Sequence, residues 1–255
     1  MAMRKIFSIV LINVRQGIRE KTFLGVAFFF LFLLGVSLFM GELSIGEKEV
    51  ALRNISLSAI EVSCLFLVVL GIVNNFYREK ETRLKEVYLS YFPQGSYLAG
   101  KLIGYILICC IYIFMASVLA GIILAVNKAF IWQFFLGSWG IFLKISLFCS
   151  ICLLFSCVFD YPLLAALSTV FAYVAAEFSA SALKITTVSN NAVTKIWMKA
   201  LYHLVPNSDK IDMKYQAIYG HTLPVYFLGY VSLYVLIYIL FAFSLSVLVF
   251  SKKEH

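Results

Sequence analysis

The stretch KLIGYILICCIYIFMASVLAGIILAV, residues 101–126, decides the fold of this chain. After Lys101 it carries no charged residue, and a helix of about 20 apolar residues crosses a bilayer core of about 30 Å. The stretch therefore predicts a transmembrane span, and five further runs meet the same requirement. The six predicted spans are Phe23–Met40, Ile55–Tyr77, Lys101–Val126, Ile141–Phe159, Pro162–Leu183 and Leu223–Phe250.

The composition of the whole chain agrees with a membrane environment. Its 255 residues are 62% hydrophobic and only 13% charged, with a mean hydropathy of +0.94, whereas a soluble domain carries about 25% charged residues. The formal net charge is +8. The basic residues lie between apolar runs and not on one helix face, which favours anionic headgroups over nucleic acid as their partner. The fold class predicted is an all-α, multi-pass integral membrane protein.

The distribution of basic residues predicts the orientation in the membrane. Basic residues are frequent before the first span, in the loop after the second span, and at the C-terminus, where Lys252 and Lys253 lie. The loop at 41–54 instead has three glutamates against two basic residues. Because short cytoplasmic loops are enriched in Lys and Arg, both termini are predicted to be cytoplasmic. An even number of spans agrees with this orientation.

The chain is predicted to form one transmembrane domain with three non-spanning segments. The N-terminal segment mixes basic and apolar residues, which fits an interfacial helix and an ordinary anchor of the first span equally well. The predicted parts are 1–22 (interfacial helix), 23–77 (spans 1 and 2), 78–100 (cytoplasmic loop), 101–183 (spans 3 to 5), 184–222 (external helical segment) and 223–255 (span 6 and tail).

The cytoplasmic loop begins REKETRLKEVYLSYF at residue 78 and has the pattern of an exposed amphipathic helix. Glu79 and Arg83, and Glu81 and Lys85, are oppositely charged pairs at i,i+4 spacing, which stabilises a helix. Pro93 then breaks the pattern. Such a helix is suited to docking a soluble partner, and the alternative is a solvated connector. The residues predicted to make the contact are Glu79, Glu81, Arg83, Leu84, Lys85, Val87 and Tyr88.

The external segment is predicted to contain a helix from about residue 190 to 203. Asn190 or Asn191 can cap it, and Pro206 ends it. Trp197 is the type of side chain that lies at headgroup level. With Pro206 and Asn207 after the helix, this segment is interpreted as a lid or re-entrant element at the outer leaflet.

Three ionisable residues lie inside predicted spans: Glu61, Lys144 and Glu177. At 1.5 Å per residue they lie roughly 5–10 Å below the outer surface, where a charge is costly and usually faces protein or water. Either they form a shared polar cluster beside an externally open cavity, or Lys144 extends alone to the headgroups and each glutamate has a local partner. The sequence favours the second interpretation for Lys144 and the cavity for the glutamates.

Motifs for enzymatic or metal chemistry are weak. GSYLAGK, residues 95–101, matches part of a phosphate-binding loop, but Leu102 stands where that loop needs Ser or Thr, and a span follows. Cys149 and Cys152 form a CxxC pair inside a span, with no histidine nearby, and are interpreted as packing residues. We therefore expect no metal and no cofactor in this chain, and no enzymatic activity of the chain by itself.

The order of these parts resembles the ABC-2 type (type V) permease of ABC exporters. The most specific piece is REKETRLKEVYLSYFPQGSYLAGKLIG, residues 78–104, in which Pro93, Gly100 and Lys101 stand at the matching positions. A second piece, LYHLVPNSDKIDMKYQAIYG at 201–220, is similar to the family's Leu-Pro-Asn segment. The chain departs from the family at Thr82-Arg83, where Gly-Thr is common, and at Gln94-Gly95, where Ser-Arg is common.

The resemblance implies a permease dimer, made with a second copy or a homologue, that binds two copies of a separate ATP-binding subunit carrying ATP and Mg. Residues 78–92 would be the coupling helix. The first, second and fifth spans would line the cavity, where Glu61 and Glu177 lie. The implied function is ATP-driven export of a substrate, lipidic or amphipathic, across a bacterial-type cytoplasmic (inner) membrane. The alternatives are an ion-coupled secondary transporter and a non-transporting structural or assembly subunit.

Overall fold

The computed structural model describes residues 2–44, 47–82, 84–188, 206–221 and 224–253, and over these ranges the chain is helical without a β-strand. The predicted all-α class is therefore confirmed. The helices are α1 (Ala2–Arg19), α2 (Lys21–Leu43), α3 (Lys48–Glu81), α4 (Leu84–Tyr91), α5 (Gln94–Val126), α6 (Gln133–Val158), α7 (Pro162–Val188), the 3₁₀ helix η1 (Ser208–Lys210), α9 (Lys214–Tyr219) and α10 (Val225–Lys253).

Five helices, α2, α3, α5, α6 and α10, are long and apolar enough to cross a membrane. The chain is therefore a multi-pass membrane protein. The remaining predicted span coincides with α7, whose apolar part with described side chains is Pro162–Phe178, shorter than the other five. A sixth crossing at α7 stays a prediction.

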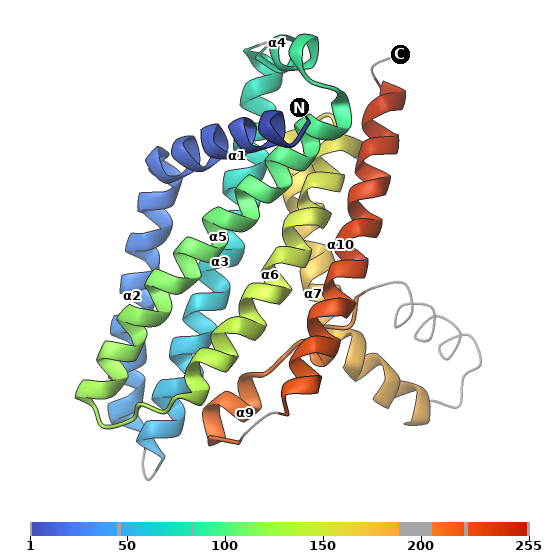
Figure 1. Cartoon of the computed structure of the whole chain (residues 1–255). Coiled ribbons are helices and arrows are strands. Elements are labelled where there is room, and N and C mark those ends of the chain that lie inside the picture. The colour runs from blue at the N-terminus through green and yellow to red at the C-terminus, as the bar shows by residue number, and fades with distance from the viewer. Residues whose placement is uncertain (1, 45–46, 83, 189–205, 222–223, 254–255) are drawn as a thin grey trace.

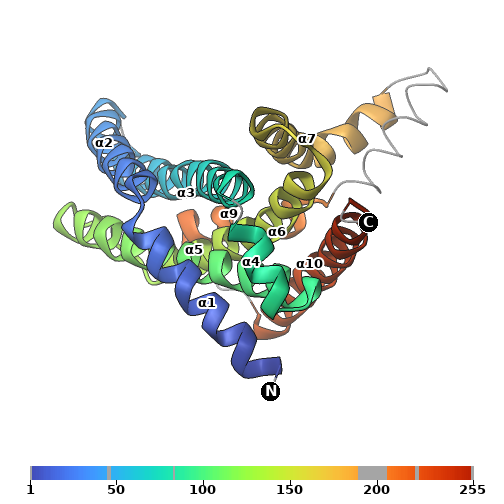
Figure 2. The same ribbon diagram turned by 90° about the horizontal axis from the view of Figure 1, so that it is seen from above.

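The long helices lie side by side, and α1 lies across one end of them (Figure 1). That end also carries α4 and the last turn of α10, so we call it the terminal end. The short helix α9 lies at the opposite end, which we call the α9 end. Viewed from above the terminal end, α3 lies between α2 and α7 (Figure 2).

Helix α1 packs against α5 through one face. Ile9, Val10 and Asn13 are buried, and Asn13 lies so close to Gly104 that a Cβ atom at Gly104 would be 2.9 Å from the Asn13 Cβ. The absence of a side chain at Gly104 therefore permits the close approach of the two helices. At Glu20 the chain turns into α2, and an ion pair of 2.6 Å between Glu20 and Arg78 connects this elbow to α3.

The predicted helix over 78–92 is divided in two in the structure. Helix α3 continues to Glu81, the chain turns at Thr82, and α4 begins at Leu84. Helix α5 begins at Gln94, ahead of the predicted start of the third span at Lys101. Pro93 is the N-cap of α5, a position where the missing backbone N–H of proline costs nothing. Proline thus starts the next helix here, where the sequence interpretation had it break the previous one.

Part of the predicted external segment lies at the α9 end. The predicted helix at 190–203, with Trp197, lies outside the described residues. Pro206 is buried next to Asn207, whose side chain accepts a hydrogen bond of 3.0 Å from the Asp209 N–H and so caps η1. The Asn207 N–H donates to the Tyr234 hydroxyl at 3.1 Å. These contacts connect the segment to α10.

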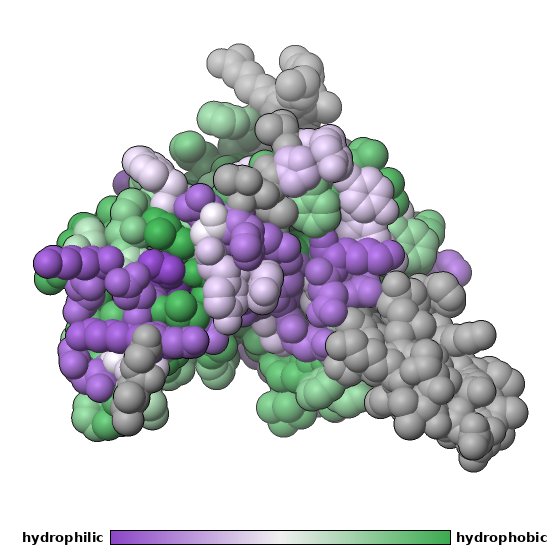
Figure 3. Space-filling model, turned by 90° about the horizontal axis from the view of Figure 1, so that it is seen from below, coloured by the Kyte–Doolittle hydropathy of each residue, from purple (hydrophilic) through white to green (hydrophobic). Residues whose placement is uncertain are grey.

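A buried arginine fixes the α9 end. Arg53 of α3 donates to the carbonyl oxygens of Ala129 at 2.6 Å and Ile218 at 3.0 Å, and it pairs with Glu49 at 3.0 Å. One guanidinium thus joins α3 to the α5–α6 turn and to α9. Viewed from below, hydrophilic residues form a band across this end, with hydrophobic residues around it (Figure 3).

Candidate functional site

The three ionisable residues predicted inside spans come together in the structure. The Lys144 ammonium of α6 lies 2.6 Å from a carboxylate oxygen of Glu61 in α3 and also pairs with Glu177 of α7. Glu61 and Lys144 are only 3% and 2% exposed. Lys144 therefore does not extend alone to the headgroups, which was the interpretation favoured for it; it lies between two carboxylates on neighbouring helices.

Two further residues complete this group, and the sequence interpretation missed both. Lys214 of α9 pairs with the second carboxylate oxygen of Glu61. The Tyr173 hydroxyl donates a hydrogen bond of 2.6 Å to Glu61 Oε1, and the Lys144 ammonium lies 5.2 Å from the Tyr173 ring centroid. We call these residues the charged cluster: Glu61, Lys144, Tyr173, Glu177 and Lys214.

The charged cluster is balanced, with two lysines and two glutamates. Charges below the membrane surface are tolerated when they pair and when hydrogen bonds satisfy their remaining atoms. Glu61 meets this condition fully, because both of its oxygens have a cationic partner. The cluster joins α3, α6, α7 and α9, so a movement of α9 changes the charge balance around Glu61.

The exposed side of the charged cluster is at Glu177, whose side chain is 36% exposed. Two large cavities lie near the terminal end, and no residue of the cluster lines either of them. The predicted cavity at Glu61 and Glu177 therefore stays a prediction. The structure shows a buried charged cluster that is exposed at Glu177.

A second buried ion pair lies beneath α4. Lys101 of α5 pairs with Glu79 of α3 at 2.8 Å, and the Tyr97 hydroxyl donates to the same Glu79 oxygen at 2.7 Å. Lys101 is 1% exposed and Glu79 is 5% exposed. Glu79 was predicted to contact a docking partner, but its side chain points into the protein. We call Glu79, Tyr97 and Lys101 the α4 anchor.

Helix α4 rests on this anchor through Tyr88, whose ring stacks on the Tyr97 ring with centroids 5.9 Å apart. Partial burial and the nearby Glu79 carboxylate raise the pKa of Tyr88 above its ordinary value. Glu81 and Leu84, predicted for docking, are exposed. Arg83, and the side chains of Lys85 and Val87, lie outside the described residues. The described part of α4 thus has one face on the anchor and one face open.

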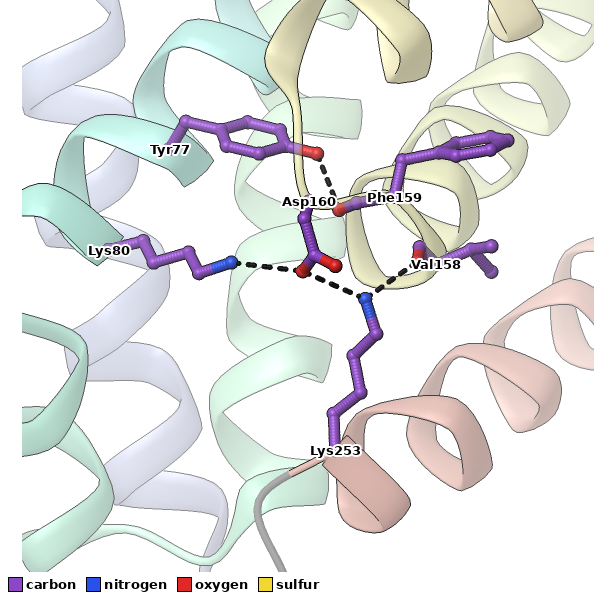
Figure 4. A network of polar contacts seen from close by, with 6 residues as sticks. All are labelled: Tyr77, Lys80, Val158, Phe159, Asp160 and Lys253. Atoms are coloured by element: carbon purple, nitrogen blue, oxygen red, sulfur yellow. Dashed lines mark hydrogen bonds and ion pairs between the residues drawn. The ribbon is translucent and has the colours of Figure 1, made fainter.

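An exposed carboxylate joins three elements at the terminal end (Figure 4). Asp160, in the α6–α7 turn, pairs with Lys253 of α10 at 3.0 Å and with Lys80 of α3 at 3.2 Å. Lys253 also donates to the Val158 carbonyl at 2.6 Å, and Tyr77 donates to the Phe159 carbonyl at 2.7 Å. No pattern in the sequence indicated this network, because its members are far apart along the chain.

The hydrogen bonds from Lys253 and Lys80 lower the pKa of Asp160 below its ordinary value. A lowered folded-state pKa means that the network contributes to stability above the ordinary pKa of an aspartate. That contribution is lost only as the pH falls through the lowered value. At neutral pH the carboxylate is ionised and the connection is intact.

Five of the six cysteines are buried inside the bundle, and Cys110 is exposed. All six are free, and the sulfur atoms of Cys109 in α5 and Cys149 in α6 lie 3.8 Å apart. Cys149 and Cys152, the predicted packing pair, are fully buried. Among the residues that the structure describes, no group of three or more His, Cys, Asp or Glu side chains is placed to hold a metal ion.

The chain matches the model of a known protein family over much of its length. Residues 4–150 match the family model described as CcmB protein, which is more than half of the 255 residues. The matched range runs from α1 through most of α6, so it includes α4, the α4 anchor, and both Glu61 and Lys144 of the charged cluster. No curated protein matches the chain.

Proposed function

The chain belongs to the CcmB protein family, a family of permeases of ABC-type systems, and from this premise we propose that it is the transmembrane subunit of an ABC-2 type exporter. The observation that carries the proposal is the family match over residues 4–150. A permease of this class implies an ATP-binding partner. In the proposal the chain itself hydrolyses nothing, and ATP and Mg bind to the partner subunit.

The proposed assembly has two permease chains, identical or homologous, and two ATP-binding subunits. Both termini and α4 lie at the same end of the protein, which the positive-inside rule places in the cytoplasm, where the ATP-binding subunits are. The proposed location is the inner membrane of a bacterial-type cell. The family suggests haem as the exported compound. Haem is amphipathic, which agrees with the lipidic or amphipathic substrate proposed from the sequence.

The proposed route of coupling is the open face of α4. Force applied to α4 reaches Tyr97 through the Tyr88 ring, and from Tyr97 it reaches α3 through Glu79. The Tyr97 ring also lies 6.1 Å from the Phe250 ring of α10. A displacement of α4 by a bound ATPase is therefore transmitted to α3, α5 and α10 together, which supports its assignment as the coupling helix.

A proline inside α4 is expected to abolish ATP-driven transport while the chain still inserts. Val87→Pro forces Glu86, a residue of α4, away from the helical conformation. A proline beyond the first position of a helix costs up to about 3 kcal/mol, enough to unfold so short a helix. Gln94→Pro is the matched control, because Gln94 lies outside the predicted docking residues and is the first position of α5, where a helix tolerates proline. Export into inverted vesicles and ATPase activity of the purified complex are measured.

The expected result for Val87→Pro is ATP hydrolysis without export, and for Gln94→Pro near-normal export. Reversal of charge at Arg83 and Lys85 is expected to act like Val87→Pro by weakening the contact with the ATPase. Normal export by both Val87→Pro and the reversed-charge variant would show that α4 is not the coupling helix.

Neutral variants of the charged cluster are expected to reduce transport. Glu61→Gln loses charge-assisted hydrogen bonds worth about 1.5–3 kcal/mol, so we expect export to fall by roughly tenfold, with a smaller decrease for the more exposed Glu177→Gln. Export is measured at equal amounts of inserted chain, with Glu42→Gln, an exposed change outside the cluster, as the control. Unchanged export by both variants would remove the functional role of the cluster.

One observation favours a second candidate function. Carboxylates at depth are the groups that ion-coupled secondary transporters use, and Glu61 and Glu177 are such groups. Purification distinguishes the two functions. Co-elution of the chain with a nucleotide-binding protein, and export that needs ATP, support the exporter. Transport by the isolated chain in vesicles with only an ion gradient supports the secondary transporter. A stable complex without a nucleotide-binding protein supports an assembly subunit.

A further inference from the structure

A small cavity lies where the elbow between α1 and α2 packs against α3 and α5, and we call it the elbow chamber. Its volume is about 20 Å³, and a cavity of at least about 10–15 Å³ can hold a water molecule. The polar side chains in its wall are Glu20, Thr22, Tyr105 and Cys109, and the rest of the wall consists of apolar residues and glycines. No described residue of α7, the predicted fifth span, lines it. The chamber is therefore a small site between these four helices with room for an ordered water.

Tyr105 of α5 brings a buried hydroxyl to the wall of the elbow chamber. Tyr105 is 5% exposed, and no described residue makes a hydrogen bond with its hydroxyl. A buried hydroxyl without a partner is costly, and buried polar groups are nearly always bonded to protein or to an ordered water. The Tyr105 hydroxyl therefore needs a partner, and a water in the chamber can provide it.

Two acceptor groups of the elbow lie in the same wall. Glu20 pairs with Arg78 through Oε1, so its Oε2 atom can accept a further hydrogen bond. Gly17 lies in the last turn of α1, where carbonyl groups lack a partner within the helix, and its carbonyl accepts a long hydrogen bond of 3.4 Å from the Glu20 N–H. A water that accepts from Tyr105 and donates to these two oxygens has three partners, the usual number for a buried water.

The elbow chamber lies beside a tight contact between α1 and α5. A Cβ atom at Gly17 would overlap the side chain of Ile108, and both residues line the chamber. The chamber is therefore a defined gap next to close packing, and its walls can hold a small occupant in one place.

We infer that the elbow chamber holds an ordered water that joins the Tyr105 hydroxyl to Glu20 and to the end of α1. Together with the ion pair between Glu20 and Arg78, this water completes a polar connection from α5 through the elbow to α3. Tyr105 is then a positioning residue, which holds the Glu20 carboxylate toward Arg78 through the water. The inference rests on the fold alone, so it stands or fails independently of the export function.

Radiolytic hydroxyl labelling of the purified full-length chain in nanodiscs tests for the water, because radicals formed from a bound water label the side chain beside it. Mass spectrometry then locates the label. Tyr112 of the same helix is the matched control: it is 4% exposed, its hydroxyl donates to the Val26 carbonyl at 3.4 Å, and it does not line the chamber. Tyr105 is expected to be labelled several-fold faster than Tyr112. This comparison needs no variant.

A pair of glycine variants removes the room for the water without changing a polar group. A Cβ atom added at Gly71 or at Gly35 meets no protein atom within 4 Å, so both positions accept a methyl group. Gly71 lines the chamber and Gly35 does not. Gly71→Ala is therefore expected to lower the labelling of Tyr105 to the level of Tyr112, and Gly35→Ala is expected to leave it unchanged.

The effect of Tyr105→Phe on stability has a sign that depends on the water. With the water present, the change removes a hydrogen bond, so the midpoint of thermal unfolding is expected to fall by about 2–4 °C. In a chain that already carries Gly71→Ala, the hydroxyl has lost its partner. There Tyr105→Phe is expected to leave the midpoint unchanged or to raise it, because it removes an unpaired polar group.

Three results would overturn the inference. Equally slow labelling of Tyr105 and Tyr112 would mean that the chamber is dry. A higher midpoint for Tyr105→Phe in the otherwise wild-type chain would mean that the hydroxyl has no partner. A change in the Tyr105 label when choline replaces sodium in the buffer would mean that a cation occupies the chamber.

Discussion

Replacing Lys144 by methionine is expected to destabilise the folded chain by about 3–5 kcal/mol, the cost of removing one partner from a buried ion pair. The ammonium of Lys144 contacts both Glu61 and Glu177. The change therefore leaves two carboxylates close together, with Lys214 as the one remaining lysine of the charged cluster. Methionine keeps the length and most of the volume of lysine, so the loss is of charge and not of packing. Unfolding of the purified chain in detergent, and the amount of chain in the membrane, measure the effect.

A double variant separates charge from packing at this position. Lys144→Met combined with Glu61→Gln removes one positive and one negative charge, so it is expected to recover part of the stability lost by Lys144→Met alone. Lys128→Met, at the exposed α5–α6 turn, is the matched control and is expected to change stability by less than about 0.5 kcal/mol. Wild-type stability of Lys144→Met would show that the cluster is not held by this charge.

The second large effect is expected at the α4 anchor. Lys101→Met leaves the Glu79 carboxylate buried, with the Tyr97 hydroxyl as its remaining partner, and is also expected to cost about 3–5 kcal/mol. The ratio of export to ATP hydrolysis distinguishes a role of the α4 anchor in coupling from a purely structural role of the ion pair. Complexes with Lys101→Met, assembled at permissive temperature, are expected to hydrolyse ATP with little export, because α4 no longer moves α3 and α5 together.

The compensating change for this pair is Glu79→Leu. Replacement of both partners of a buried ion pair by hydrophobic residues is often neutral for stability. Lys101→Met with Glu79→Leu is therefore expected to regain most of the stability but not the coupling, since Glu79→Leu removes the acceptor of the Tyr97 hydroxyl that joins α5 to α3. Arg19→Met, at an exposed cation of the same end, serves as the control for stability. Full export by the double variant would show that the Lys101–Glu79 ion pair contributes to stability but not to coupling.

The spans could be predicted well because their signal is local. A run of apolar residues with the length of a bilayer needs no knowledge of the rest of the chain, and α2, α3, α5, α6 and α10 were all found in this way. Their ends were less accurate. The start of α5 was placed too late because Lys101 was taken as the first residue of the span. In the structure the helix begins at Gln94, and Tyr97 and Lys101 are both buried, to 1% exposure each.

The candidate site could be predicted in part. Glu61, Lys144 and Glu177 were found because a charge inside a span is costly and therefore noticeable. Tyr173 lies four residues before Glu177 and so on the same helix face, a signal that could have been used. Lys214 carried no such signal, because it lies in the segment predicted to be external, where a lysine is ordinary. Its pairing with Glu61 depends on how α9 packs against α6.

The packing of α9 against α6 shows why contacts between distant helices could not be predicted from the sequence. A Cβ atom at Gly137 of α6 would lie 2.7 Å from the Cβ of Ala217 in α9, so α9 can reach the charged cluster only because both residues are small. Glu79 is a similar case. Its spacing to Arg83 predicted a surface pair, but α3 continues through this position and turns the carboxylate toward Lys101.

The position of Lys253 matters for anyone who handles this protein in the laboratory. Its ammonium holds the Asp160 turn at the terminal end, where α4 also lies. A purification handle or fluorescent reporter joined directly behind it would crowd both features. A flexible spacer at that junction, or an epitope placed in the α2–α3 turn on the far side, keeps the surface around α4 accessible.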